Sequence, residues 1–513
     1  MSDYLALYRQ YLQSINPVVD GEFLIAENLS TNWDEPETAL DFHNCAVMAL
    51  IEAENSPMRS MYVEMAFQSL QRVLEMAVYP LATAHLALVY YLVGDRDLAA
   101  QNAFNALVQV LSSVNANYPL GLIYYFPAHN RLELLRDLLE TANYNEQTLI
   151  LSTEILYRSS LAFYNQNGVR FLELANHVNP NSCHLNRQLG IAKLINQQLE
   201  GLFHLHRAVN LDPEDADNLQ ALYLAYRGLG QQQLANFWLE TAKVTGKSWT
   251  NLDINQPFTY LDFDRDITLA VEASFRSFVT GVLLAQGDWF EAEMEFWRHS
   301  IREGMTVIDV GANAGVYTFS AAHRVGKTGK VIAIEPFSQC VQLLEETCRI
   351  NQFSWVYPCR GAASNQGGNV YLSLYQASEL NEVVTDATQL KSDNYEPVPC
   401  FTIDSLIDTY QLERVDLLKI DAEGHEVAVL EGSQLLIERF SPIILYENIA
   451  GNQGSNLAAA RWLEGKGYRL YRYRPYLQEL LEIESEADLQ GILNVIALSE
   501  QELRKPSIWS SRQ

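Results

Sequence analysis

Apolar positions recur at helical spacing in the first half of the chain and gather into short β-type runs in the second half. Residues 37–245 carry many apolar residues three or four positions apart, which indicates amphipathic helices. Beyond them, apolar runs alternate with amphipathic stretches such as 340–350 and 426–439. This alternation predicts a doubly wound α/β sheet whose last two strands are antiparallel. The predicted strands are Val307–Val310, Val331–Ile334, Val370–Leu374, Val415–Ile420, Ile443–Tyr446, Tyr468–Tyr473 and Asn494–Ser499.

The clearest helical pair begins near Pro80 and turns at Gly94. Its second helix places small residues on one face, which lets two helices approach closely. These small residues are Ala99, Ala103 and Ala106. The unit resembles a tetratricopeptide repeat, a helical pair of about 34 residues. The resemblance implies a concave surface that holds a partner protein or the acceptor.

The same pattern returns at 183–213 and again from Ala216. Gly121 and Tyr124 keep its phase, although the stretch after them lacks the small residues. The sequence therefore predicts an all-α, tetratricopeptide-repeat-like domain over 1–245 that is degenerate in its middle. Its role is either docking, for the acceptor or a protein partner, or a structural cap on the second domain.

The predicted domain organisation has three parts. Residues 1–245 form the helical domain, 246–285 a linker and entry segment, and 286–513 the α/β domain. The best candidate for the linker itself is Thr245–Asp266, which contains the polar stretch TNLDINQP.

The composition of the chain narrows the classes of partner that it is expected to bind. The 513 residues include 63 acidic and 35 basic side chains, so the formal net charge is -28. Such a balance argues against nucleic acid and against anionic membranes as partners. The chain shows neither a secretory signal nor an apolar run long enough to span a bilayer. Its six cysteines form no metal-binding spacing and are interpreted as buried thiols in a reducing compartment, so we expect a cytoplasmic protein.

The most informative segment is TVIDVGANAGVYT at 306–318. A buried strand carries Asp309, and a loop with Gly311 and Gly315 leads into a helix, an arrangement that suits an anionic or polar ligand. Glu335 ends the next strand, where an acidic residue accepts hydrogen bonds from a ribose diol. Asn313 occupies the position where a dinucleotide site needs glycine, so a nicotinamide cofactor is disfavoured. Asp309 suits a cofactor with a cationic end, namely S-adenosylmethionine.

Seven motifs in order resemble the FkbM family of S-adenosylmethionine-dependent methyltransferases over about residues 286–500. They are DVGANAG (309–315), IEP (334–336), FTIDSL (401–406), LLKIDAEGHE (417–426), VLEG (429–432), IILYEN (443–448) and NVIALS (494–499). The resemblance implies a Rossmann-like class I methyltransferase fold. It also implies O-methylation of sugars, polyketides or other small acceptors.

The same resemblance implies the cofactor site. Its expected members are Asp309, Gly311, Asn313, Gly315, Tyr317, Thr318, Glu335 and Ala362. The segments 377–398 and 476–491 depart from the family pattern, and we expect them to form the acceptor pocket.

Candidate catalytic residues follow two strand ends, where α/β folds place their ligands. Asp421 and Glu447 are the first choices for contacting the acceptor or the methyl group, and His425 is a candidate base. Glu423 is expected to accept N–H bonds in its own turn. Lys419 is expected to pair with a carboxylate. The cluster would also suit Mg²⁺, but the tight turn favours transfer without a metal.

Further candidates and functions stay open. Glu291 and Glu293 are expected to stabilise the entry helix, although one of them would reach the amino group of the cofactor. The alternative to an active methyltransferase is an interaction scaffold with a catalytically idle fold.

Overall fold

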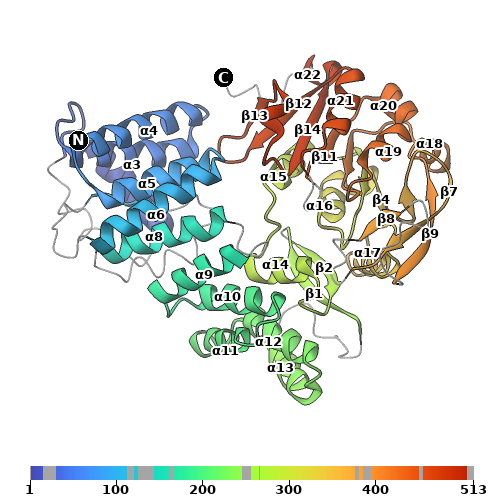
Figure 1. The fold of residues 1–513 in the computed structure, drawn as a ribbon, viewed down its shortest axis with the longest axis horizontal. Coiled ribbons are helices and arrows are strands. Elements are labelled where there is room, and N and C mark those ends of the chain that lie inside the picture. The colour runs from blue at the N-terminus through green and yellow to red at the C-terminus, as the bar shows by residue number, and fades with distance from the viewer. Residues whose placement is uncertain are drawn as a thin grey trace. The chain divides into compact units, whose positions relative to one another are not determined.

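Helices make up the first half of the chain and strands alternate with helices in the second, as Figure 1 shows. The chain divides into two units, Met1–Ala221 and Leu222–Ser511. The computed structural model describes residues 2–15, 31–112, 121–124, 144–160, 166–244, 256–264, 266–375, 381–384, 394–449 and 454–504.

Unit one is built from helices that pack in sequence-adjacent pairs, among them α3 with α4, α5 with α6 and α10 with α11. The helices described in it are α1 (Ser2–Ile15), α3 (Ala39–Asn55), α4 (Arg59–Met76), α5 (Pro80–Leu92), α6 (Arg96–Ser112), α8 (Tyr144–Ser159), α9 (Gln166–Val178), α10 (Cys183–Ile195) and α11 (Gly201–Leu211). α12 (Ala216–Gly228) crosses the division, and α13 (Gln232–Val244) lies in unit two.

Local sequence explains where these helices begin and turn. Thr38 caps α3 in a capping box with Asp41, which satisfies amide groups that the helix itself leaves free. Pro80 stands in the first turn of α5, where its missing N–H costs nothing. Gly94 turns the chain between α5 and α6 with a φ of 87°. The predicted small-residue face is confirmed, because Ala99, Ala103 and Ala106 are all fully buried.

The middle of the helical half differs from the prediction. Residues 121–124 have no regular secondary structure, so Gly121 and Tyr124 do not continue a repeat. Both are held in place by side chains from other helices rather than by helical neighbours.

The main sheet of unit two has eight strands in the order β13-β12-β14-β11-β10-β3-β4-β5. Five strands are parallel: β3 (Thr306–Val310), β4 (Lys330–Glu335), β5 (Val356–Arg360), β10 (Leu417–Ile420) and β11 (Ile443–Glu447). β12 (Tyr468–Arg474), β13 (Glu479–Glu482) and β14 (Asn494–Ser499) run antiparallel, as expected for the last predicted strands. The strand order reverses between β3 and β10, and doubly wound sheets bind ligands at such a point.

Helices cover both faces of this sheet. α16 (Val316–Val325) packs on β3 and β4, and α17 (Ser338–Asn351) packs on β4 and β5. α18 (Ser405–Thr409), α19 (Glu426–Glu431), α20 (Gln434–Phe440) and α21 (Leu457–Gly465) contribute to one large apolar core with the strands. The stretch 426–439, expected as one amphipathic segment, forms two helices separated at Gly432 and Ser433. α22 (Glu500–Arg504) follows β14.

Two smaller sheets lie outside the main one. A four-stranded sheet, β6-β9-β7-β8, comprises β6 (Ala362–Ala363), β7 (Gly368–Ser373), β8 (Glu382–Val384) and β9 (Tyr395–Phe401). The predicted strand Val370–Leu374 therefore exists but belongs to this sheet. A hairpin of β1 (Phe258–Phe263) and β2 (Ile267–Glu272) lies partly within the interval expected as a linker. α14 (Phe278–Gln286) and α15 (Glu293–Ser300) connect it to β3.

In the part of the chain that the structure describes, no helix has both the length and the apolarity that crossing a bilayer requires.

Candidate active site

The loop after β3 needs its glycines. Gly311 has a φ of 77°, and a Cβ atom there would lie 1.8 Å from the carbonyl oxygen of Asp421. Gly315 has a φ of 94°, and its Cβ would meet the ring of Phe319 at 2.4 Å. Asn313 also takes a positive φ, 48°. The loop is thus folded tightly against β10 and α16, with α16 beginning directly after it.

Glu335 closes the other side of this loop from the end of β4. One of its carboxylate oxygens accepts the N–H of Asn313 and the other accepts the N–H of Phe337, both at 2.8 Å. Burial raises the pKa of Glu335 to about 7, against the opposing effect of these two bonds. Each oxygen keeps a further lone pair, so the carboxylate can accept hydrogen bonds from a diol.

Asp309 has a buried carboxylate oxygen that indicates a ligand-binding site. The residue is fully buried, and its Oδ2 accepts the hydroxyl of Thr318 at 2.6 Å. Among the described residues, no hydrogen-bond donor meets its Oδ1. Burial raises the pKa of Asp309. A buried oxygen without a donor is costly, and a ligand with a cationic or N–H group would satisfy it.

Strand register brings the remaining candidates to the same face of the sheet. Lys419 pairs with Asp309 on one side and with Leu445 on the other. Because side chains alternate along a strand, Asp421 and Glu447, each two residues further on, project to that same face. Lys419 is buried and donates to Asp421 at 2.7 Å. The expectation that Lys419 pairs with a carboxylate is therefore confirmed.

Three carboxylates gather at the end of β10 and β11. Asp421, Glu423 and Glu447 each place one oxygen within 4.8 Å of the others. Burial raises the pKa of Glu447 strongly, and the charges of Asp421 and Glu423 raise it further. Within the described residues, Oε2 of Glu447 is buried without a hydrogen-bond partner. This carboxyl group can therefore hold a proton near neutral pH.

The turn after β10 is held by a residue that sequence reasoning did not select. The N–H groups of Ala422 and Gly424 donate to Oε1 of Glu426, at 3.1 and 3.0 Å. The role expected for Glu423 is thus taken by Glu426, whose other oxygen accepts the side chain of Asn456. Glu423 instead places one carboxylate oxygen within 4.8 Å of carboxylate oxygens of Asp421 and Glu447. The signal was present in the motif DAEGHE, since a glutamate at the start of a helix commonly accepts preceding N–H groups.

His425 lies beside a different strand. Its Nε2 is 3.0 Å from the hydroxyl oxygen of Ser364, which follows β6. Burial lowers its pKa, so the imidazole stays neutral. Ala362, expected near the adenine, is buried in β6 and pairs with Cys400.

Tyr317 connects the residues just before α15 to the strand ends. Its hydroxyl donates to Glu291 at 2.6 Å, and Asn494 donates to the same oxygen at 2.9 Å. The ammonium group of Lys419 lies 4.6 Å from the centre of the Tyr317 ring. Burial raises the pKa of Glu291, while Lys419 lowers it. Glu291 therefore belongs to the site, whereas Glu293 is the first residue of α15.

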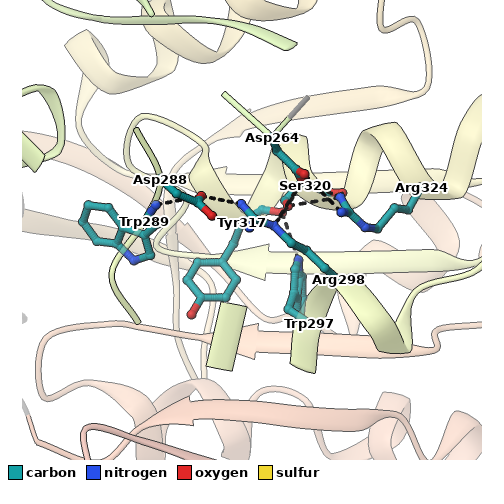
Figure 2. A network of polar contacts seen from close by, with 8 residues as sticks. All are labelled: Asp264, Asp288, Trp289, Trp297, Arg298, Tyr317, Ser320 and Arg324. Atoms are coloured by element: carbon teal, nitrogen blue, oxygen red, sulfur yellow. Dashed lines mark hydrogen bonds and ion pairs between the residues drawn. The ribbon is translucent and has the colours of Figure 1, made fainter. Parts of the chain in front are cut away.

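An ion-pair cluster holds α15 and the residues just before it (Figure 2). Arg298 donates to both oxygens of Asp288 at 2.6 Å, and its Nε donates to Ser320 at 3.0 Å. Asp264, in the β1–β2 turn, accepts from Ser320 and Arg324. Figure 2 shows the ring of Tyr317 pointing away from these charges.

Trp297 adds a bond from α15 to α16. Its indole N–H donates to the carbonyl of Tyr317 at 3.0 Å. The entry segment is therefore part of the same packed unit as the strand ends.

Comparisons with known proteins give one family match. Residues 309–470 match the family model described as the methyltransferase FkbM domain. Residues 309–470 thus match an FkbM methyltransferase domain, as the motifs predicted, and the cofactor that this match indicates is S-adenosylmethionine. No significant match exists among curated proteins.

Solved structures give weaker likenesses. A methyltransferase FkbM from Methylobacillus flagellatus is 15% identical, with a TM-score of 0.26, over 43% of this chain and 54% of that one. A SAM-dependent methyltransferase from Aquifex aeolicus is 16% identical, with a TM-score of 0.24, over 40% and 89%. MamA is 15% identical, with a TM-score of 0.25, over 36% and 90%. These scores are too low to establish a shared fold.

The residues present fit this cofactor. Oδ1 of Asp309, which has no hydrogen-bond partner among the described residues, suits an ammonium group, and the carboxylate of Glu335 suits a ribose diol. The glycines at 311 and 315 let the loop between them pack against Asp421 and Phe319. Asn313 contributes its backbone to the loop.

Proposed function

We propose that the chain transfers a methyl group from S-adenosylmethionine to an oxygen atom of a small-molecule or carbohydrate acceptor. The observation that carries this proposal is the convergence of Asp309, Glu335, Asp421 and Glu447 at the point where the strand order reverses. S-adenosylmethionine supplies an already activated methyl group. The protein must then mainly position the acceptor in line with that group.

Asp421 and Glu447 act on the acceptor side. Asp421 is fixed by Lys419 at 2.7 Å, which suits a residue that orients a hydroxyl group. Glu447 acts as a hydrogen-bond donor to an oxygen of the acceptor, because its raised pKa keeps the carboxyl group protonated near neutral pH. His425 is the weaker candidate for contacting the acceptor, since its ring is engaged with Ser364. Tyr317 and Ala362 line the cofactor in this proposal.

Transfer proceeds without a metal. The carboxylates of Asp421, Glu423 and Glu447 are close enough to hold a cation, but Asp421 is already neutralised by Lys419. A chelator such as EDTA should therefore leave the initial rate of methyl transfer unchanged. Activity that is lost with EDTA and restored by Mg²⁺ or Mn²⁺ would contradict this assignment.

The domain boundaries and the helical half belong to the same proposal. Residues 1–245 form a tetratricopeptide-repeat-like domain that docks the acceptor or a protein partner. Residues 246–285 lead into the methyltransferase motifs at 286–513 and fold together with them, and the protein works in the cytoplasm.

Cofactor binding is tested by calorimetry on the full chain. Replacing Glu335 with alanine removes the acceptor of the diol bonds. Hydrogen bonds to charged groups contribute about 1.5–3 kcal/mol, so the affinity for S-adenosylmethionine should fall roughly tenfold or more. Glu345→Ala, on the exposed side of α17, is the matched control and should bind normally. Unchanged binding by Glu335→Ala, or tight binding of NAD, would refute the site.

The acceptor class is tested with S-adenosylmethionine that carries a radiolabelled methyl group. We expect label in alkali-stable small molecules or carbohydrates from a cell extract, and a slower rate for Asp421→Asn at unchanged cofactor affinity. Label confined to protein or nucleic acid would exclude the proposed acceptor.

A further inference from the structure

Arg472 and Arg474 stand at the carboxyl end of β12, and we call them the arginine pair. Arg469, on the same strand, forms an ion pair with Glu482 at 3.6 Å. Among the described residues, no carboxylate forms an ion pair with either member of the arginine pair, and Nε of Arg474 is buried without a hydrogen-bond acceptor. The chain carries 63 acidic and 35 basic side chains, so two neighbouring cations without a carboxylate partner go against its overall charge.

The arginine pair is electrostatically unfavourable in the protein alone. Its two members are two positions apart on one strand, so their side chains project to the same face. Burial lowers the pKa of Arg474, and the charge of Arg472 lowers it further. Glu479 stands opposite Arg474 in the β12–β13 register and opposes this effect, yet the two form no ion pair. A half-buried guanidinium beside a second cation favours the binding of an anion.

The arginine pair lies at the edge of the sheet where the carboxylates of the candidate active site gather. β11 and β12 both run antiparallel to β14, so their carboxyl ends meet at that edge. Neighbouring strands are about 4.8 Å apart, which places the end of β12 about 10 Å from Glu447 at the end of β11. Side-chain alternation directs the arginine pair to the face opposite Glu447, but ligands of doubly wound sheets bind outside the strand ends, where side chains of both faces reach them.

The hairpin that carries the arginine pair is fixed to the rest of unit two. The ring of Tyr473 packs against Phe296 of α15, with the ring centres 5.7 Å apart. In the turn before β13, Gln478 donates to Glu295 of the same helix at 3.0 Å. A site on a fixed hairpin loses less conformational freedom when a ligand binds. The segment 476–491, which we expect to line the acceptor pocket, begins two residues after the arginine pair.

We propose that the arginine pair binds an oxyanion of the methyl acceptor, either a phosphate or the carboxylate of a uronic acid. The inference rests on the proposed methyl transfer and restricts its acceptor to anionic carbohydrates and anionic small molecules. A guanidinium donates to two oxygens of a phosphate or carboxylate at once. The carboxylates at the ends of β10 and β11 repel an anion. The acceptor is therefore oriented with its charged group at β12 and a hydroxyl group at Asp421 and Glu447.

Binding is tested by calorimetry on the full chain, with glucose 6-phosphate and glucuronate as probes and glucose as the neutral control. Wild-type protein should bind at least one of the two anions and should not bind glucose; the anion that binds identifies the phosphate or the carboxylate as the group. Arg474→Gln should lower the affinity for that anion about tenfold or more. Arg474→Lys keeps the charge but loses the planar fork, and should give an intermediate affinity.

Arg469→Gln is the matched control, because it removes one positive charge from the same strand. It should bind the anion as wild type does. Equal losses in Arg469→Gln and Arg474→Gln would mean a general attraction to positive charge and would overturn the proposal. Wild-type protein that binds neither anion, or that binds glucose equally well, would overturn it too.

Thermal melting separates a binding role from a structural one. Arg474→Gln removes a half-buried cation that lacks an ion pair, so its melting temperature should equal or exceed that of wild type, and its affinity for S-adenosylmethionine should be unchanged. A lower melting temperature would assign a structural role to Arg474 and overturn the proposal.

The radiolabelled methyl assay keeps this inference distinct from the proposed function. Labelled products from the cell extract should be retained on an anion-exchange column. Label in neutral products alone would contradict an anionic acceptor while supporting methyl transfer. An extract without any labelled product would contradict methyl transfer, and the calorimetric titrations would still decide whether the arginine pair binds an oxyanion.

Discussion

Lys419 is shared by several carboxylates at the centre of the site. It donates to Asp421, and the charges of Asp421, Asp309 and Glu291 all raise its pKa. Three acidic side chains thus surround a single ammonium group, so their possible negative charge exceeds its positive charge. The site is therefore electronegative where the cationic end of the cofactor is expected, which favours a sulfonium and an ammonium group over a pyrophosphate.

The protonation state of Glu335 should govern cofactor affinity. Its pKa, raised to about 7, means that the carboxylate is ionised above pH 8 and mostly protonated at pH 6. Only the ionised form accepts bonds from both hydroxyls of a diol while holding the N–H groups of Asn313 and Phe337. We therefore expect the affinity for S-adenosylmethionine to be constant above pH 8 and to fall as the pH drops from 8 to 6, by up to about tenfold per unit. Calorimetry across this range measures it.

Glu335→Gln supplies the control for this pH dependence. Glutamine keeps the size of the side chain but does not titrate, so its affinity should be lower and nearly flat between pH 6 and 8. A slope that persists in this variant would assign the titration to another group.

At the residue scale, the sequence predicted the acidic residues near the strand ends better than the residues that support them. Glu335 and Glu447 end their strands, and Asp309 and Asp421 lie within one residue of a strand end. Parallel register brings these strand ends together. Glu423 and Glu426 were harder to tell apart. Both stand in one six-residue motif, and which of them bonds the turn depends on where α19 begins. Glu291 needed tertiary contacts with Tyr317 and Asn494 to be recognised.

At the element scale, the loop between β3 and α16 depends on a missing side chain. In Gly311→Ala, the new Cβ would overlap the carbonyl oxygen of Asp421 at 1.8 Å, in a backbone conformation that alanine disfavours. Overlap in a packed site and left-handed backbone each cost about 1–3 kcal/mol. We expect the free energy of unfolding to fall by more than about 3 kcal/mol and cofactor binding to be lost. Urea unfolding and calorimetry measure the two effects.

Gly467→Ala separates sterics from backbone strain. Gly467 has a similar φ, 83°, but open space around its missing Cβ. Its replacement should cost only about 1 kcal/mol and leave cofactor binding intact. Equal losses in the two variants would mean that close approach to Asp421 does not matter.

Periodicity predicted the elements well where each buries one face. The alanine face of α6 follows this rule. The central strands of the main sheet are buried on both faces, and their continuous apolar runs predicted them instead. Periodicity did not predict that residues 121–124 lack regular secondary structure, because their apolar side chains are buried by helices distant in the sequence. It also did not detect β1, whose burial alternates along a strand that follows a polar stretch. Nor does a strand pattern by itself say which sheet a strand joins, as β7 shows.

At the scale of the whole molecule, the β1–β2 hairpin packs on α15, α16 and α17 within unit two. The N–H of Ala270 donates to Thr347 at 2.9 Å, and that of Thr268 donates to Asn351 at 3.0 Å. The ion pairs of Asp264 with Arg298 and Arg324 join the same hairpin to α15 and α16. We infer that the folding unit of the methyltransferase includes these strands, so a boundary at 286 is too late for an autonomous domain.

Two fragments test this inference. Residues 250–513 keep β1, β2 and α14, and should melt cooperatively and bind S-adenosylmethionine with nearly the affinity of the full chain. Residues 286–513 lack them, which leaves the side of α17 that β2 covers exposed and removes Asp264 from Arg298 and Arg324. Buried charges that lose a partner and newly exposed apolar surface both destabilise the fold, so this fragment should aggregate or melt without a cooperative transition. Asp264→Asn in fragment 250–513 should give an intermediate melting temperature. If fragment 286–513 melts cooperatively and binds the cofactor as tightly as 250–513, the hairpin is dispensable and the domain begins at 286.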